Sequence, residues 1–61
     1  MQNTQLFETA VRDAVVVLNL IREGAFTGPA YTTADLSTEN AKADGWTFEQ
    51  IEAEAKRHVG Q

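Results

Sequence analysis

Apolar residues in the first third of the chain recur at the spacing of packed helices. The intervals are four, three, four and three positions, and the residues are Phe7, Val11, Ala14, Leu18 and Ile21. Such a row lies on one face of an α-helix and packs against other helices. Asn3 or Thr4 can cap the start of this helix, and Gly24 stands where a helix C-terminus favours glycine. We therefore predict a helix over residues 4–23.

A second apolar row accompanies the first on the same predicted helix. It comprises Leu6, Ala10, Val17 and Leu20, while Val15 flanks the first row on its other side. In the stretch AVVVLNLI, residues 14–21, seven of eight residues are apolar, so the apolar arc exceeds half of the helix circumference. Valine runs also favour strands, which makes a strand over 15–21 the alternative. The helix is preferred because its spacing begins before the valines and continues through them without a turn signal.

Gly28 and Pro29 indicate a turn in the middle of the chain. Proline removes a backbone donor and does not continue a helix. Residues 24–36 are therefore predicted to be irregular. Phe26 and Tyr31 stand on either side of the turn and are expected to cover the open end of the helical core.

A short helix is predicted over residues 37–44. Ser37 or Asp35 can cap its start, and Gly45 is well placed to end it. Because this segment contains few apolar residues, we expect it to bury little surface of its own.

The last helix, predicted over residues 48–59, has the clearest start signal. Thr47 is followed three residues later by Gln50, which is the glutamine form of a capping box. Trp46 before the cap and Ile51 after it match a hydrophobic staple.

These elements predict an all-α fold, with one small helical domain over residues 1–61. The later helices carry too few apolar residues to cover both rows of the first helix, and an uncovered apolar row marks a protein contact. We therefore predict a homodimer built on the first helix. Asp13 lies within the apolar arc and Arg22 on its opposite border, so an ion pair between two copies is our hypothesis. The predicted interface comprises Leu6, Ala10, Asp13, Val15, Val17, Leu20 and Arg22.

The composition excludes several kinds of site. There is no cysteine, which excludes disulfides and thiolate zinc sites, and the one histidine, His58, has only Glu54 one turn before it. No sequence context marks Ser37 as a nucleophile, and 61 residues leave little room for both a pocket and a core. We therefore predict no enzymatic activity, no cofactor and no metal. A basic leader and an apolar run of about 18–20 residues are both lacking, so a cytoplasmic location is expected.

The charge of the chain is uneven. Of nine acids and five bases, six acids and one base, Lys42, fall between residues 35 and 54, and the net charge is −4. Such a surface repels phosphate groups, which disfavours nucleic acids and anionic membranes as partners. It would attract a protein with a basic surface. The predicted acidic face comprises Asp35, Glu39, Asp44, Glu49, Glu52 and Glu54.

The function predicted from these features is that of a small acidic interaction protein that binds and inhibits another protein. In its class it is similar to the accessory inhibitors carried by phages and mobile elements. A DNA-binding regulator is the alternative, because Ala41, Gly45 and Ile51 have helix-turn-helix spacing. The acids Glu49 and Glu52 on the would-be recognition helix oppose it. A purely structural assembly subunit is the third possibility.

Overall fold

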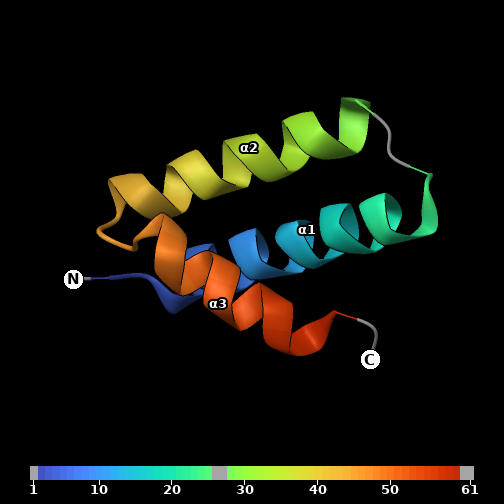
Figure 1. The fold of residues 1–61 in the computed structure, drawn as a ribbon. Coiled ribbons are helices and arrows are strands. Elements are labelled where there is room, and N and C mark those ends of the chain that lie inside the picture. The colour runs from blue at the N-terminus through green and yellow to red at the C-terminus, as the bar shows by residue number, and fades with distance from the viewer. Residues whose placement is uncertain (1, 26–27, 60–61) are drawn as a thin grey trace.

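The computed structural model of the protein describes residues 2–25 and 28–59. Within these residues the chain forms three α-helices and no strand, and the helices are α1 (Thr4–Glu23), α2 (Gly28–Ala43) and α3 (Phe48–His58) (Figure 1). The predicted all-α fold class is therefore confirmed. α1 and α2 form an antiparallel pair, and α3 crosses α1 at an angle. In the part of the chain just specified, no helix combines the length and the apolar character that crossing a bilayer requires.

α1 has the bounds that the apolar spacing predicts. At its start the Asn3 side chain accepts a hydrogen bond from the backbone N–H of Gln5, at 2.9 Å. At its end Gly24 has a φ of 74°, a left-handed conformation that glycine adopts without a steric penalty. The N–H groups of Gly24 and the next residue donate to carbonyls of the last turn. The carbonyl end of α1 is thus closed by a Schellman motif.

The middle of the chain is where the sequence prediction was wrong. The segment 24–36, predicted to be irregular, is helical from Gly28 onward, and the short helix predicted over 37–44 is the second half of α2. The reason is the position of Pro29. It is the second residue of α2, and in the first turn of a helix the missing N–H of proline costs no intrahelical hydrogen bond. The turn signal therefore marks the start of a helix.

Hydroxyl side chains of α2 bond back to the carbonyls of the same helix. Thr32 and Thr33 donate to the carbonyl oxygens one turn earlier, each at 3.1 Å. Ser37 and Asp35, predicted as helix caps, instead lie in the middle of α2. Ser37 is buried and donates to the carbonyl of Ala34 at 3.1 Å, so its hydroxyl has a partner within α2.

The corner between α2 and α3 has the features that the sequence predicts. Gly45 has a φ of 103°, and the N–H groups of Gly45 and Trp46 donate to carbonyls of the last turn of α2. The capping box is present in both directions. Thr47 Oγ1 accepts from the N–H of Gln50 at 3.1 Å, and Gln50 Oε1 accepts from the N–H of Thr47 at 2.9 Å. α3 ends at His58, one residue before the predicted end.

The second apolar row of α1 packs against α2. The face of α2 that packs there is made of small residues at helical spacing, namely Ala30, Ala34, Ser37 and Ala41, all buried or half-buried. Ala10 of α1 and Ala41 of α2 have no exposed surface and belong to one buried cluster. Because α2 extends back to Gly28, it covers a length of α1 that a short helix would have left open.

The core lies where the three helices meet. It comprises Ala10, Val11, Ala41, Ile51 and Ala55. Ile51 of α3 is the largest of its fully buried side chains, at 1% exposure, and three of the other four residues are alanines. Ile51 therefore supplies much of the volume at the centre of a thin core.

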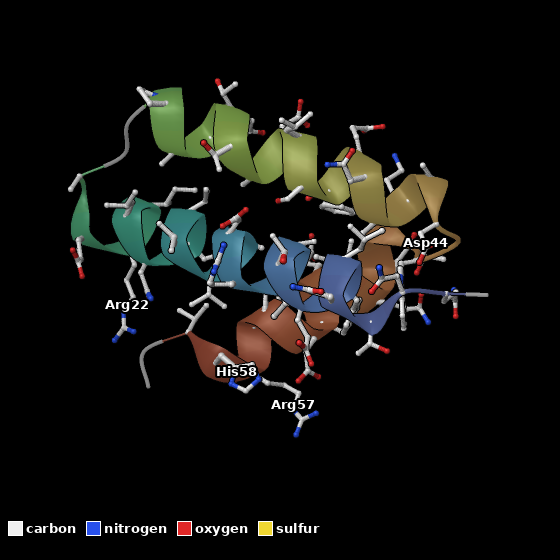
Figure 2. All side chains as sticks on the ribbon, turned by 180° about the vertical axis from the view of Figure 1, so that it is seen from behind. Arg22, Asp44, Arg57 and His58 are labelled. Carbon is white, nitrogen blue, oxygen red and sulfur yellow. The ribbon has the colours of Figure 1, made fainter. Side chains whose placement is uncertain are left out.

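The start of α1 is attached to the corner between α2 and α3. The rings of Phe7 and Trp46 stack with their centroids 4.4 Å apart. The Trp46 indole N–H donates to the carbonyl of Asn3 at 3.3 Å, and the backbone N–H of Asn3 donates to the carboxylate of Asp44. Figure 2 shows Asp44 at this end of the molecule, with Arg22 at the other end of α1. These contacts connect the first residues of the chain to the last two helices.

Candidate protein-binding groove

Half-exposed apolar side chains from all three helices line one groove. Among the described residues, the large hydrophobic side chains with substantial exposure are Val16, Ile21, Tyr31, Leu36 and Phe48. Three of them, Ile21, Tyr31 and Phe48, are between 51% and 55% exposed and line the groove, whereas Val16 and Leu36 do not. Gathered exposed apolar side chains are typical of surfaces that bind proteins, membranes or ligands.

The groove lies between α2 and α3, over the C-terminal half of α1. Both helices pack on α1 but diverge from their shared corner and have little contact with each other (Figure 1). The floor consists of apolar residues of α1: Ala14, Val17, Leu18 and Ile21. The walls carry Tyr31, Ala34 and Thr38 from α2, and Phe48 and Ile51 from α3. The volume between them is about 390 Å³.

Charged side chains follow both rims of the groove. Asp35 and Glu39 stand on the α2 rim and Glu52 on the α3 rim, with Lys42 as the one base among the lining residues. Lys42 Nζ lies 3.6 Å from Glu39 Oε1, and Glu52 Oε1 lies 2.9 Å from Lys56 Nζ. These ion pairs are exposed and stabilise the fold only slightly. The groove is therefore apolar inside and predominantly acidic along its edges.

The six acids of the predicted acidic face do not form one face. Only the three rim acids line the groove. Asp44 is half-buried at the corner, where it accepts the hydrogen bond from the start of the chain. Glu54 lies on the other side of α3, and Glu49 is exposed on α3 away from the groove lining. The acids thus divide into a rim group and separate surface residues.

The apolar row predicted as a dimer interface is largely covered within the chain. Ala10 is fully buried and Val17 is 8% exposed, because the longer α2 packs there. Leu6, Val15 and Leu20 are half-buried. The argument that this row requires a second chain therefore loses its basis, and the homodimer stays a prediction.

Asp13 and Arg22, the other two residues of the predicted interface, lie on different sides of α1. The Asp13 side chain is 14% exposed, and its Oδ1 lies 3.6 Å from Nε of Arg12 in the same chain. Nine residues correspond to about two and a half helical turns, which places Arg22 on the opposite side of the helix. Arg22 projects away from α2 (Figure 2). One contact face on α1 does not contain both side chains, so the hypothesis of an ion pair between copies gains no support.

The aromatic residues of the groove were not identified as surface residues from the sequence. Tyr31, expected to cover the core, is 55% exposed on the groove wall, and Phe48 is 51% exposed. Phe26, the other residue expected to cover the core, lies outside the described residues. The sequence does contain a signal for the α2 wall. Positions 31, 35, 38 and 42 have helical spacing, so they share one face of a helix that starts at Gly28.

A second, shallower hollow lies between α1 and α3 and contains the histidine. Its volume is about 600 Å³, and Glu54 and His58 lie on its α3 side. His58 Nε2 lies 3.0 Å from Glu54 Oε2, and Arg57 Nη1 lies 3.1 Å from Glu54 Oε1. The hydrogen bond with His58 lowers the pKa of Glu54 below its ordinary value of 4.5, partial burial opposes this, and Arg57 adds to the lowering. Glu54 is therefore ionised at neutral pH, which does not suit a general acid.

No group of three or more metal-ligating side chains occurs in residues 2–25 and 28–59.

The corner with helix-turn-helix spacing is present, with Ala41 and Ile51 buried and Gly45 in the left-handed region. The basic residues of α2 and α3 each pair with a carboxylate: Lys42, Lys56 and Arg57. Such pairing leaves little uncompensated positive charge for phosphate groups, and DNA binding stays an untested alternative.

Neither a family model, nor a curated protein, nor a solved structure matches this chain. The functional argument therefore depends on the surface of the molecule itself. The groove between α2 and α3 is the surface feature that combines exposed apolar side chains, a concave shape and charges of mainly one sign.

Proposed function

We propose that this protein is a small, acidic, non-enzymatic interaction protein that binds another protein through the groove between α2 and α3 and inhibits it. The observation that supports this is the gathering of Ile21, Tyr31 and Phe48 around one concave surface, each about half exposed. Burying the exposed halves of three such side chains is worth about 2–4 kcal/mol of gross binding free energy. This contribution alone does not hold a complex together, so the proposed contact also includes surface beside the groove, and rim charges add selectivity.

The groove has the chemistry of a contact surface and lacks that of a catalytic pocket. Its floor consists only of aliphatic side chains, from Ala14 to Ile21. Asp35, Glu39 and Glu52 are spread along the rims. Catalysis requires a nucleophile, an acid or a base that converges on a shielded point. Binding without chemistry is the activity that this arrangement supports.

Inhibition is the part of the proposal that concerns the effect on the target. In this proposal the protein carries out no reaction and acts by covering a functional surface of its target. A net charge of −4 directs it to a basic surface, including one that otherwise holds nucleic acid. Accessory inhibitors carried by phages and mobile elements form a similar class, and we place the protein in this class as part of the proposal.

The test is capture of a partner by the purified protein, with two matched serine variants. Phe48→Ser removes an apolar wall of the groove, while Leu36→Ser removes an exposed apolar side chain of α2 outside it. We expect one protein to be retained by the wild type and by Leu36→Ser in a stoichiometric complex, and to be lost with Phe48→Ser. The activity of that protein should fall in the complex. Equal retention by both variants would reject the groove as the contact surface.

Two further measurements separate this proposal from the other functions considered. Titration of mixed-sequence DNA at low salt should give no binding, whereas saturable binding would favour the DNA-binding regulator. Sedimentation at low micromolar concentration, in the absence of the partner, should give the mass of the monomer or of the predicted homodimer. A large particle of discrete mass would instead favour a structural assembly subunit.

A further inference from the structure

The shape of the groove matches a single helix. An object lying between α2 and α3 rests on α1 and contacts all three helices at once, as the fourth helix of a bundle does. The floor runs from Ala14 to Ile21, which is two helical turns or about 10 Å. Helices bind such grooves with side chains at positions i, i+3 or i+4, and i+7. The occupant therefore needs an apolar row of about two turns.

The charges of the rims determine which helix fits. Acids stand on both sides of the apolar floor, Asp35 and Glu39 on α2 and Glu52 on α3. Glu39 and Glu52 also form exposed ion pairs with Lys42 and Lys56. Asp35 forms no ion pair among the described residues, so it contributes most to the negative charge of the rims. A helix lying in the groove brings the residues beside its apolar row close to both rims. Lysine or arginine at these positions gains attraction from both sides, whereas acidic residues there are repelled.

A second copy of this chain does not meet these requirements. It carries the same net charge of −4, so two copies repel each other. Outside the groove, the exposed large hydrophobic residues among those described are Val16 on α1 and Leu36 on α2. Neither of them has a second exposed large hydrophobic residue one turn away on the same face of its helix. No described helix of the protein offers the apolar row that the groove requires.

We propose that the groove binds one amphipathic helix of its target, with a row of aliphatic side chains flanked on both sides by lysine or arginine. This inference rests on the proposed function, since it assigns an occupant to the same contact surface. It specifies the partner by chemistry: a basic amphipathic segment that lies along α1 between α2 and α3.

The experiment measures the fluorescence anisotropy of two labelled peptides of about 18 residues, long enough for five helical turns. Both carry leucines in one row at helical spacing, flanked in one peptide by lysines and in the other by glutamates. We expect the lysine-flanked peptide to bind at least about tenfold more tightly at low salt, with the preference declining as salt screens the rims. Equal affinity of the two peptides would overturn the proposal.

Two pairs of variants locate the binding. Asp35→Lys and Glu49→Lys each change the net charge from −4 to −2, but only Asp35 lines the groove. Asp35→Lys should weaken binding of the lysine-flanked peptide about threefold or more, and Glu49→Lys less than twofold. Phe48→Ala should weaken it about tenfold, and Leu36→Ala should leave it unchanged. Equal effects within either pair would overturn the assignment to the groove.

The outcomes also separate this inference from the proposed function. If a captured target is lost with Phe48→Ser but no basic helical peptide binds, the groove remains the contact surface and the occupant is different. If sedimentation shows a dimer that Phe48→Ser dissociates, the occupant is a second copy and the proposal is wrong. If Phe48→Ser affects neither target nor peptide, both proposals fail.

Discussion

Replacement of Ile51 by alanine is predicted to remove a large part of the stability of the fold. Substitution of a buried isoleucine by alanine costs about 2–5 kcal/mol, depending on how far the surroundings close the cavity. Ile51 is 1% exposed, and its core neighbours include Ala10, Ala41 and Ala55, whose methyl groups have no rotamer with which to fill the space. We therefore expect a loss in the upper half of that range. The total stability of 61 residues is about 3–9 kcal/mol.

The assay is urea unfolding, followed by far-ultraviolet circular dichroism and by the fluorescence of Trp46. The free energies of unfolding of the variant and of the wild type are compared with one shared m-value, which is the slope of the free energy against urea concentration. Leu36→Ala is the control, because Leu36 is 64% exposed and its truncation should change the stability by less than about 0.5 kcal/mol. A loss below about 1 kcal/mol for Ile51→Ala would refute the reasoning, since it would mean that Ile51 does not fill the centre of the core.

Four further predictions address the caps, the helix packing and the charges. Thr47→Ala removes the capping box of α3 and should lower the free energy of urea unfolding by about 0.5–2 kcal/mol. Gly45→Ala should lower it by about 1–2 kcal/mol in the same assay, because a φ of 103° is strained for any residue with a Cβ atom. Ala10→Leu inserts a large side chain where α1 meets α2 and should cost about 1–3 kcal/mol, seen as a lower thermal midpoint. His58→Ala removes the largest cause of the lowered pKa of Glu54, so this pKa should rise toward 4.5 in a carboxyl NMR titration. Because the folded-state pKa is lowered, the stabilising contribution of Glu54 is present at neutral pH and declines as the pH falls through that pKa.

The elements with local signals were predicted correctly from the sequence. α1 has a periodic apolar row and a glycine at its end, and α3 begins with a capping box. Both signals involve residues within one or two turns of each other, so the sequence contains the information needed to place them. The all-α fold class follows from these two helices.

The first half of α2 was missed because its signal is ambiguous. Pro29 ends a helix when it lies in the interior and favours one when it lies in the first turn. The threonines and alanines that follow give no strong periodicity. Their small side chains form a helix here because that face packs against α1, where Ala10 and Ala41 belong to one buried cluster. Tertiary packing thus determines α2, and the sequence prediction did not take it into account.

The groove depends on the arrangement of all three helices, and the sequence alone did not predict it. Ile21 belongs to an apolar row that predicts burial, yet it is about half exposed, as is Phe48. Ile21 is exposed because α2 and α3 diverge from the corner at Gly45 and leave the end of α1 uncovered between them. That an apolar surface binds a partner stays a prediction, and of the interface residues predicted from the sequence only Val17 lines the groove.

The central claim is that the partner contacts this groove, and site-specific photo-crosslinking tests it most directly. One variant carries a benzophenone amino acid in place of Phe48, and a second variant carries it in place of Leu36. Both side chains are exposed in the wild type, but only Phe48 lines the groove. After irradiation in the native lysate, we predict one discrete crosslinked species from position 48 and none from position 36. A discrete species from position 36, with none from position 48, would contradict the account.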